Sequence, residues 1–335
     1  MALADIEKKY DLMNEACELL QAQLEDDWLD ALTENFDNLL NNGEVHVEDG
    51  VPDEKTAGRL AEIYREVNLA EMGTEDRRLL LQVSLLAAYR RERVQANHQM
   101  TPDTIGFLMA YLLQQVYVGR KEANVLDLCV GTGNLEAVII NSLNEGGCKD
   151  VRGFGIDNDD TLLAIAGIES ELCGLNLELY HQDALDRLLV PKADVVVCDL
   201  PVGWYPVDER AAEYETHAAE GHSFVHFLLI EQALNCLKEG GIGLFLVPSG
   251  MFEDESSLPL LNVIHDKGYL QSLIKLPGTM FSSKKSEKAV LLLQRKGGSA
   301  RQADPVLLGE FPSVRDREKF EKFMAEVAVW KKENF

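Results

Sequence analysis

Apolar residues recur every three or four positions through residues 1–40, a spacing that predicts one or two amphipathic helices. Residues 54–70 and 75–95 repeat the pattern, and Thr74 is expected to cap the second segment because its hydroxyl can accept a backbone N–H. None of these segments shows a catalytic pattern. We therefore expect residues 1–95 to form a helical layer that is structural or binds a partner protein.

After residue 120 the pattern changes to short apolar runs that alternate with helical segments. The predicted strands are 124–129, 151–156, 177–182, 193–198, 241–247, 270–276 and 289–294. The helices predicted between them are 134–143, 159–173, 220–238 and 256–267. Such alternation is typical of a parallel sheet with helices on both faces. A short basic loop joins the last two runs, which predicts an antiparallel pair at an edge of the sheet.

A polar break at residues 97–102 separates the two patterns. Thr101 and Pro102 are expected to start the helix that follows, over residues 103–118, because proline is tolerated in a first helical turn. A charged helix is predicted near the C-terminus, over residues 313–332. The predicted organisation is a helical domain over 1–95, an α/β domain over 96–297, and a strand and helix extension over 298–335 that packs on it.

The charge of the chain limits the kinds of partner that it can bind. It holds 32 Lys and Arg against 57 Asp and Glu, a formal net charge of −25. A strongly acidic surface repels phosphate backbones, and proteins that bind nucleic acid usually show a basic patch. The alternative is that the acidic residues only keep the protein soluble.

An apolar content of 46% is enough for a core, but no apolar run approaches the roughly 18 residues that span a bilayer. The N-terminus lacks the basic start and apolar segment of a signal peptide, so a cytoplasmic location is expected. The six cysteines are scattered without a CxxC pair, which favours buried free thiols over a disulfide framework or a zinc site. No metal site and no membrane contact are predicted.

The stretch from Val125 to Leu135 combines a strand, a glycine turn and the start of a helix. Asp127 lies at the exit of the strand, and Gly131 and Gly133 allow a sharp turn and a close approach of a ligand to the main chain. The free N–H groups of the helix that begins at Asn134 face the strand end. This arrangement is typical of nucleotide-binding corners, although many α/β proteins with a strand and Gly-x-Gly bind nothing there.

Four predicted strands each lead into an aspartate, namely Asp127, Asp157, Asp183 and Asp199. The carboxyl ends of parallel strands converge on one crevice of an open sheet, where a carboxylate can bind ribose, an amino group or a cationic ligand. A single aspartate at such a position usually caps the next helix, but four in succession are hard to explain as caps. Asp157 also follows Gly133 by roughly the 20 residues that separate a glycine turn from a ribose-binding acid.

This arrangement resembles the class I S-adenosylmethionine-dependent methyltransferases over about residues 97–297. The resemblance implies S-adenosylmethionine as cofactor and a Rossmann-like seven-stranded sheet with helices on both faces, beside an N-terminal all-helical domain. Asp157 matches the acid that binds the cofactor's ribose, and Asp183 matches the acid that accepts its adenine amino group. A dehydrogenase is less well supported, because Glu136 stands where a third glycine would be. The residues that the resemblance places at the cofactor are Thr101, Asp127, Cys129, Gly131, Thr132, Gly133, Asn134, Leu135, Asp157, Asn158, Asp183, Ala184, Asp199 and Pro201.

Three further segments resemble bacterial N6-adenine DNA methyltransferases, in particular the modification subunits of type I restriction systems. Residues 99–102 (Gln-Met-Thr-Pro) resemble their threonine–proline cofactor motif, and residues 237–250 resemble a later strand with a glycine pair and a proline. Residues 199–206 (Asp-Leu-Pro-Val-Gly-Trp-Tyr-Pro) occupy the place of Asn/Asp-Pro-Pro-Tyr/Phe. The resemblance implies that an exocyclic amine attacks the cofactor's methyl group while the Asp199 carboxylate and the Leu200 carbonyl accept its two N–H groups. The residues that it implies for catalysis are Asp199, Leu200, Pro201, Trp204 and Tyr205.

The catalytic motif departs from the family at two positions. Leu200 replaces a proline, and Val202 stands where a tyrosine or phenylalanine would stack on an extruded base. Trp204 or Tyr205 could replace that aromatic platform, or they could simply pack a loop. Cofactor binding is therefore a safer expectation than methylation of a base.

A weak candidate surface for contact with DNA lies in the loop before the last predicted strand, at Lys284, Lys285 and Lys288. The alternative is that these lysines discourage pairing of an edge strand. No domain that would recognise a DNA sequence is visible, so a partner chain would have to supply one.

Three hypotheses follow from the sequence. The leading one is N6-adenine-type methyl transfer to DNA. The second is a methyltransferase of the same fold that acts on RNA, protein or a small molecule. The third is a cofactor-binding interaction protein whose catalysis has lapsed and whose helical domain binds a partner. The acids around the cofactor favour the first two hypotheses, whereas the altered motif and the acidic surface favour the second and third.

Overall fold

The computed structural model describes residues 3–24, 27–92, 94–313 and 315–335, and the chain divides into two compact units. The first, which we name the helical unit, contains Met1–Met100, Gly131–Ala137 and Asp159–Leu175. The second, the sheet unit, contains Thr101–Val130, Val138–Asn158 and Asn176–Phe335. Two segments from the middle of the chain therefore pack with its first hundred residues.

The helical unit is built from amphipathic helices, as the apolar spacing predicts. They are α1 (Leu3–Leu24), α2 (Trp28–Leu40), α3 (Glu54–Val67), α4 (Thr74–Arg91) and α7 (Asp160–Cys173), with short 3-10 turns at Leu69–Glu71 and Ala96–His98. The pattern over residues 1–40 thus corresponds to two helices. The expectation that Thr74 caps α4 is wrong: Gly73 holds the extended cap position (φ −69°, ψ 159°), and Thr74 is already in the first turn.

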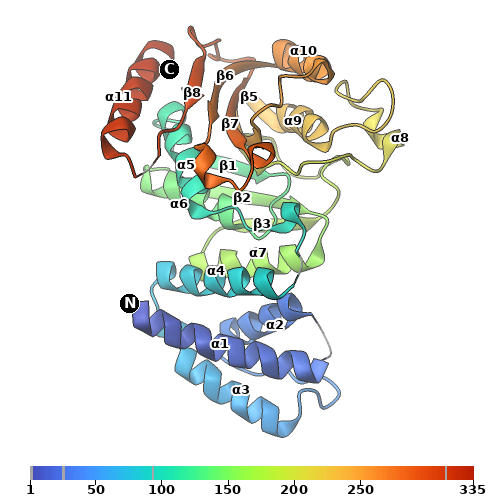
Figure 1. Ribbon diagram of the computed structural model, residues 1–335, viewed down its shortest axis with the longest axis vertical. Coiled ribbons are helices and arrows are strands. Elements are labelled where there is room, and N and C mark those ends of the chain that lie inside the picture. Colours follow the sequence, from blue (N-terminus) through green and yellow to red (C-terminus); the bar gives the residue numbers. More distant parts are fainter. Residues whose placement is uncertain (1–2, 25–26, 93, 314) are drawn as a thin grey trace. The chain divides into compact units, whose positions relative to one another are not determined.

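A single apolar cluster holds the helical unit together. Phe36, Leu60 and Ile63 are fully buried in it, and Ile165 and Ile168 of α7 belong to the same cluster. Helix α7 contacts both α2 and α4, and α4 runs beside it in Figure 1. The apolar face of the N-terminal helices is therefore covered in part by α7, which belongs to a much later part of the chain.

The sheet unit contains an eight-stranded sheet in the order β3-β2-β1-β4-β5-β7-β6-β8. The strands are β1 (Glu122–Asp127), β2 (Asp150–Asp157), β3 (Leu177–His181), β4 (Ala193–Asp199), β5 (Leu237–Pro248), β6 (Gly268–Lys275), β7 (Lys288–Arg295) and β8 (Leu307–Glu310). The seven predicted strands are confirmed, and β7 is antiparallel to both β5 and β6. The expectation that this antiparallel pair forms the edge is wrong, because β8 pairs in parallel with the outer side of β6.

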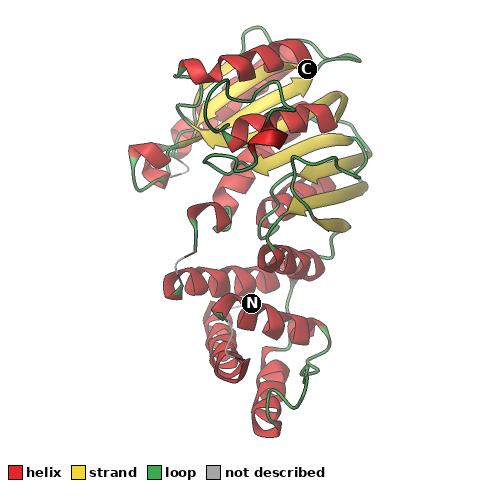
Figure 2. Ribbon diagram, turned by 90° about the vertical axis from the view of Figure 1, so that its right-hand side faces the viewer, coloured by secondary structure: helices red, strands yellow, loops and turns green. Residues whose placement is uncertain are grey.

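Helices lie on both faces of the sheet (Figure 2). They include α5 (Asp103–Val116), α9 (Val225–Cys236), α10 (Leu258–Lys267) and α11 (Arg317–Asn334), with the short α8 at Asp208–Ala211. Helix α6 (Asn134–Glu145) begins in a segment of the helical unit. The helix predicted over 220–238 begins only at Val225, because the preceding residues form an irregular loop that ends in a bridge between Trp204 and Phe224.

The core of the sheet unit lies along its central strands. Val196, Cys198, Phe245 and Leu291 are almost completely buried, and residues on both sides of these strands are apolar. Continuous apolar runs are expected of strands that are covered on both faces. No helix among the described residues is long and apolar enough to span a membrane.

Candidate functional site

Three of the predicted aspartates lie at the carboxyl ends of adjacent parallel strands. Asp127 ends β1, in register with Gly155 of β2 and Val197 of β4. Asp157 and Asp199 end those flanking strands two residues further on, so they extend past Asp127 on either side. In a pleated strand, positions two residues apart face the same side. The structure therefore brings these three carboxyl groups to one rim of the sheet.

Asp127 lies deepest of the acids at this rim. Its side chain is buried, and the backbone N–H of Cys129 donates to its Oδ1 at 3.0 Å. Burial raises the pKa of the Asp127 carboxyl to about 7, and the nearby charges of Asp157 and Asp199 add to the increase. Around neutral pH this carboxyl can therefore donate as well as accept a hydrogen bond.

Asp199, the predicted catalytic acid, has a donor on each carboxylate oxygen. The hydroxyl of Thr101 donates to Oδ2 at 2.9 Å, and the ammonium of Lys288 lies 2.5 Å from Oδ1. Thr101 immediately precedes Pro102, the cap of α5, and Lys288 is the first residue of β7, paired with Pro248. Thr101 and Asp199, which lie 98 residues apart in the chain, are thus joined directly.

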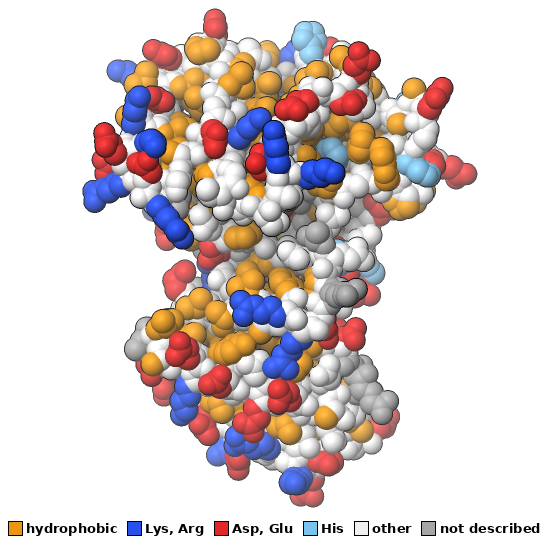
Figure 3. Space-filling view, in the orientation of Figure 1, with side chains coloured by type: hydrophobic (Ala, Val, Ile, Leu, Met, Phe, Trp, Pro, Cys, Tyr) orange, Lys and Arg blue, Asp and Glu red, His pale blue; other side chains and the backbone are white. Residues whose placement is uncertain are grey.

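The three lysines proposed to contact nucleic acid have different surroundings. Lys288 is half-buried in its ion pair with Asp199, which no sequence pattern indicated. Lys284 and Lys285 lie exposed in the 3-10 turn Lys284–Ser286. On the face of the sheet unit seen in Figure 3, basic side chains occur among acidic and apolar ones and form no continuous stripe.

Asp183 follows β3 and is held by several donors. The backbone N–H of Leu185 donates to its Oδ1 at 2.9 Å, the Tyr205 hydroxyl donates to Oδ2 at 2.6 Å, and the Arg210 guanidinium lies 3.4 Å away. Burial and the Asp183 charge raise the pKa of Tyr205. Tyr205 is almost fully buried in this contact, so its ring is not available as a stacking platform for an acceptor.

Trp204, the neighbouring aromatic residue, has the opposite character. Its side chain is 59% exposed, and its ring stacks on Phe224 with 4.1 Å between the ring centroids. A cavity of about 570 Å³ opens beside this stack. Its walls include Trp204, Thr216, His217, Phe224, Phe227 and Pro259. Phe224 had no signal in the sequence, because only folding of the loop before α9 places it against the motif.

The other members of the motif are structural in character. Leu200 is buried, and its N–H donates to the carbonyl of Leu246 in β5 at 3.2 Å, which fixes this peptide to the sheet. Val202 is 47% exposed.

His226 contacts Phe227 edge to face at 4.7 Å, and burial lowers the pKa of its imidazole to about 4. The His226 imidazole therefore stays uncharged at neutral pH.

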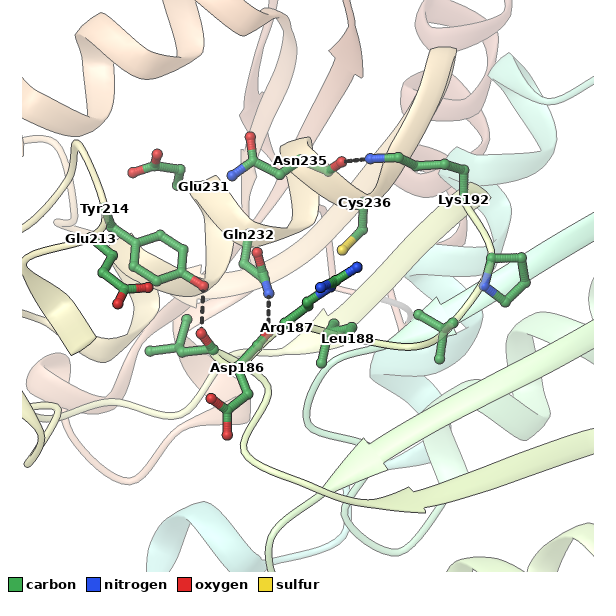
Figure 4. A pocket seen from close by; sticks show the side chains of 13 residues that line it. Asp186, Arg187, Leu188, Lys192, Glu213, Tyr214, Glu231, Gln232, Asn235 and Cys236 are labelled. Atoms are coloured by element: carbon green, nitrogen blue, oxygen red, sulfur yellow. Dashed lines mark hydrogen bonds between the residues drawn. The ribbon is translucent and has the colours of Figure 1, made fainter.

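A second cavity of the sheet unit, of about 400 Å³, lies between α9 and the loop after β3 (Figure 4). Gln232 of α9 donates to the carbonyls of Ala184 and Asp186, and the Tyr214 hydroxyl donates to the carbonyl of Leu185. No residue of the predicted site lines this cavity. This cavity therefore lies outside the predicted site.

The predicted glycine loop belongs to the helical unit. Gly131 and Gly133 have positive φ angles of 53° and 79°, which glycine adopts without strain. A Cβ atom at Gly133 would lie 3.1 Å from the Cα of Ala166 in α7, so this helix packs directly on the loop. Thr132, Asn134 and Leu135 are buried.

The surroundings of the remaining predicted site residues are as follows. Asn158 donates its backbone N–H to Asp157 Oδ1 at 2.9 Å, and its carbonyl lies 3.2 Å from His181 Nε2. Ala184 is buried and Pro201 is half-buried beside the motif. Within the described ranges no group of three or more His, Cys, Asp or Glu side chains could hold a metal ion.

Comparison with known families gives two matches within the chain. A sequence profile described as N-6 DNA Methylase matches residues 84–330. A second profile, described as the YtxK N-terminal helical domain, matches residues 7–88.

Individual relatives resemble the chain over nearly its whole length. It is 34% identical over 325 residues to YtxK of Bacillus subtilis strain 168, a protein named as uncharacterized, with 96% of both chains covered. A crystal structure from Listeria monocytogenes, named as a candidate class I S-adenosylmethionine-dependent methyltransferase, has a TM-score of 0.89 and 35% identity and covers 98% of this chain and 100% of its own. A modification subunit assigned to a type I restriction enzyme of Vibrio vulnificus has a TM-score of 0.62 at 15% identity, over 83% of this chain and 62% of its own, a likeness of fold alone.

Proposed function

Because the chain belongs to the N-6 DNA methylase family, an S-adenosylmethionine-dependent methyltransferase family, we propose that it methylates the exocyclic amino group of adenine in DNA. The methyltransferase fold predicted from the sequence is confirmed, and S-adenosylmethionine is the cofactor. The acceptor and the roles of the individual residues are the proposed part.

The carboxyl groups at the rim of the sheet unit fit this cofactor. Asp127, Asp157 and Asp199 are carboxyl groups, which can accept from ribose hydroxyls or an amino group and attract a sulfonium centre, whereas ionised carboxylates would repel a phosphate. We assign Asp157 to the ribose and Asp183 to the adenine amino group. We separately assign the glycine loop of the helical unit to main-chain contact with the cofactor. When bound, the cofactor supplies a methyl group on a positively charged sulfur.

The Asp199 carboxylate is the proposed acceptor of an amine N–H, and the Leu200 carbonyl is the second. An aromatic amine is a poor nucleophile because its lone pair is delocalised into the ring. Two acceptors on its hydrogens would localise that pair and stabilise the positive charge that develops as the N–C bond forms and the methyl–sulfur bond breaks. The sulfur would leave as a neutral thioether, and the surplus amine proton would pass to the Asp199 carboxylate. The observation that carries the proposal is the 2.9 Å hydrogen bond from Thr101, which fixes Oδ2 of Asp199.

Trp204 is the proposed stacking platform for the acceptor base. Its exposed ring is held by Phe224 behind it, so little side-chain freedom is lost when a second ring stacks on it. Stacking of a base on an aromatic side chain contributes about 1–3 kcal/mol. This arrangement would replace the aromatic residue that Val202 lacks.

Methyl transfer to DNA is tested by incubating the protein with methyl-labelled S-adenosylmethionine and DNA free of N6-methyladenine, in parallel with RNA and with protein extract. Label recovered as N6-methyladenine in the DNA supports the proposal. Label confined to RNA, protein or small molecules would refute DNA as acceptor. Binding of the cofactor with no transfer to any fraction would favour lapsed catalysis. Asp199→Ala is the inactive control, and Asp266→Ala, an exposed acid on α10, is the matched neutral one.

A further inference from the structure

A cluster of polar side chains lies inside the helical unit, and all of its members except the half-buried Gln82 are buried. Arg78 and Gln82 of α4 meet Asn134, the first residue of α6, and Glu169 of α7. The Arg78 guanidinium donates to Glu169 Oε1 at 2.7 Å and to Asn134 Oδ1 at 2.8 Å. The Gln82 amide donates to the same Asn134 oxygen at 2.9 Å. Two donors from one helix therefore fix the orientation of one side chain.

Arg78 lies on the apolar side of α4. It is 3% exposed and continues a buried stripe formed with Leu81, Leu85 and Ala88. Its partner Glu169 is 2% exposed. Replacing a buried ion pair by apolar side chains of similar volume is often neutral or stabilising, so stability alone is a weak reason for a charge here. We therefore look for the role of this ion pair in the orientation of the side chains that it contacts.

Asn134 directly follows the glycine loop, Gly131-Thr132-Gly133. The loop contacts α7 at Ala166, and Asn134, the residue that follows the loop, is held by α4. Backbone N–H groups at the start of a helix lack partners within the helix, so their direction depends on how the first residue is held. The helical unit thus fixes the loop from two helices.

We propose that Arg78 and Gln82 are positioning residues for the cofactor loop, so that the N-terminal helices set the affinity for S-adenosylmethionine. This inference rests on the proposed function in one respect, namely that the loop from Gly131 to Leu135 binds the cofactor. A helical layer expected from sequence to be only structural or partner-binding thereby becomes part of the cofactor site's support.

The test uses the full chain and two variants with different effects on the cluster. Gln82→Met removes one donor to Asn134 and leaves the ion pair intact. The double variant Arg78→Met/Glu169→Met replaces both charges of the ion pair by apolar side chains of similar length. Calorimetric titration should show S-adenosylmethionine bound about 5- to 10-fold more weakly by each variant, the effect of one lost hydrogen bond.

Hydrogen exchange gives a second readout that does not need a methyl acceptor. The amides of residues 131–135 should exchange faster in both variants without cofactor, at a temperature where circular dichroism shows each variant folded. The matched control is Arg59→Met/Glu15→Met, which removes a half-exposed ion pair of 2.7 Å between α3 and α1. It should change neither the affinity nor the exchange of the loop.

Unchanged affinity and unchanged exchange in the folded variants would overturn the inference. A separate variant, Gly133→Val, distinguishes this failure from failure of the proposed site. If Gly133→Val abolishes binding and the α4 variants do not weaken it, only the positioning role is wrong. If wild-type affinity survives Gly133→Val, the loop does not bind the cofactor and both proposals fail.

Discussion

The carboxylate of Asp199 has a donor on each oxygen before any acceptor arrives, Thr101 at Oδ2 and Lys288 at Oδ1. An amine that uses Oδ1 must share or displace the Lys288 ammonium. The ion pair is half-buried, so its solvent screening is incomplete and displacement has a cost. If Asp199 is the catalytic acid, as proposed, Lys288 influences which acceptors can reach it.

The first prediction concerns Lys288→Met. Removing the ammonium frees Oδ1, so the KM for the methyl acceptor should fall several-fold while the Kd of S-adenosylmethionine stays unchanged. Steady-state kinetics with the acceptor that the labelling experiment identifies measure the first quantity, and calorimetry measures the second. A rise in acceptor KM would show instead that Lys288 contacts the acceptor, as the sequence pattern had suggested.

The second prediction concerns the buried carboxyl of Asp127, whose pKa of about 7 exceeds the ordinary value of 3.8. Between these two values the folded protein keeps a proton that the unfolded chain releases, so stability falls as pH rises toward 7. Asp127→Asn removes this dependence. The Tm of the wild type, relative to that of Asp127→Asn, should fall from pH 5 to pH 8, as measured by calorimetry. Parallel Tm profiles would show that the folded-state pKa is not raised.

At the scale of elements, helices and strands with a clear apolar pattern could be predicted from the sequence, whereas a short strand without such a pattern could not. The seven long strands and the amphipathic helices follow from apolar spacing, which the sheet and the helical cluster require of any sequence that forms them. Strand β8 lacks that signal because it has four residues, three of them exposed. Thr74 was misplaced by one position because glycine also occupies helix caps.

Residues of the candidate site also fall into two groups, those that a local sequence pattern indicates and those that only contacts between distant segments bring there. The meeting of Asp127, Asp157 and Asp199 at one rim could be predicted because each ends an apolar run that predicts a parallel strand. Phe224 and Lys288 act through contacts with residues far away in the chain, and a single sequence contains no measure of such pairs. Arg78 left one usable signal that was passed over, a charged residue on the apolar stripe of an amphipathic helix.

The third prediction belongs to the loop between α8 and α9, which holds Phe224 behind Trp204. Trp204→Ala should raise the acceptor KM by about 5- to 100-fold, the scale of one base–aromatic stack. The Tm should change little, because the ring is mostly exposed. Phe107→Ala, an exposed aromatic residue of α5, is the control and should leave the KM unchanged. Equal KM values for both variants would remove Trp204 from the acceptor site.

At the scale of the whole molecule, a net charge of −25 opposes binding of DNA. A protein of this charge can still act on DNA if a small cationic surface supplies the contacts near the site and another chain supplies the rest. Lys284 and Lys285 are exposed in the turn that precedes Lys288, so they are placed for that role. The salt dependence of binding reports how many phosphates such a surface neutralises.

The fourth prediction is that DNA affinity, measured by fluorescence anisotropy from 50 to 200 mM KCl, has a shallow salt dependence corresponding to roughly two phosphate contacts. The double variant Lys284→Gln/Lys285→Gln should reduce the magnitude of the slope of log affinity against log salt by about 1.8, since each lost contact removes about 0.9 from it. Lys331→Gln/Lys332→Gln changes the net charge equally on α11 and should leave the slope unchanged. Equal losses in the two double variants would mean that only total charge matters, and the surface around Lys284 would not be a DNA contact.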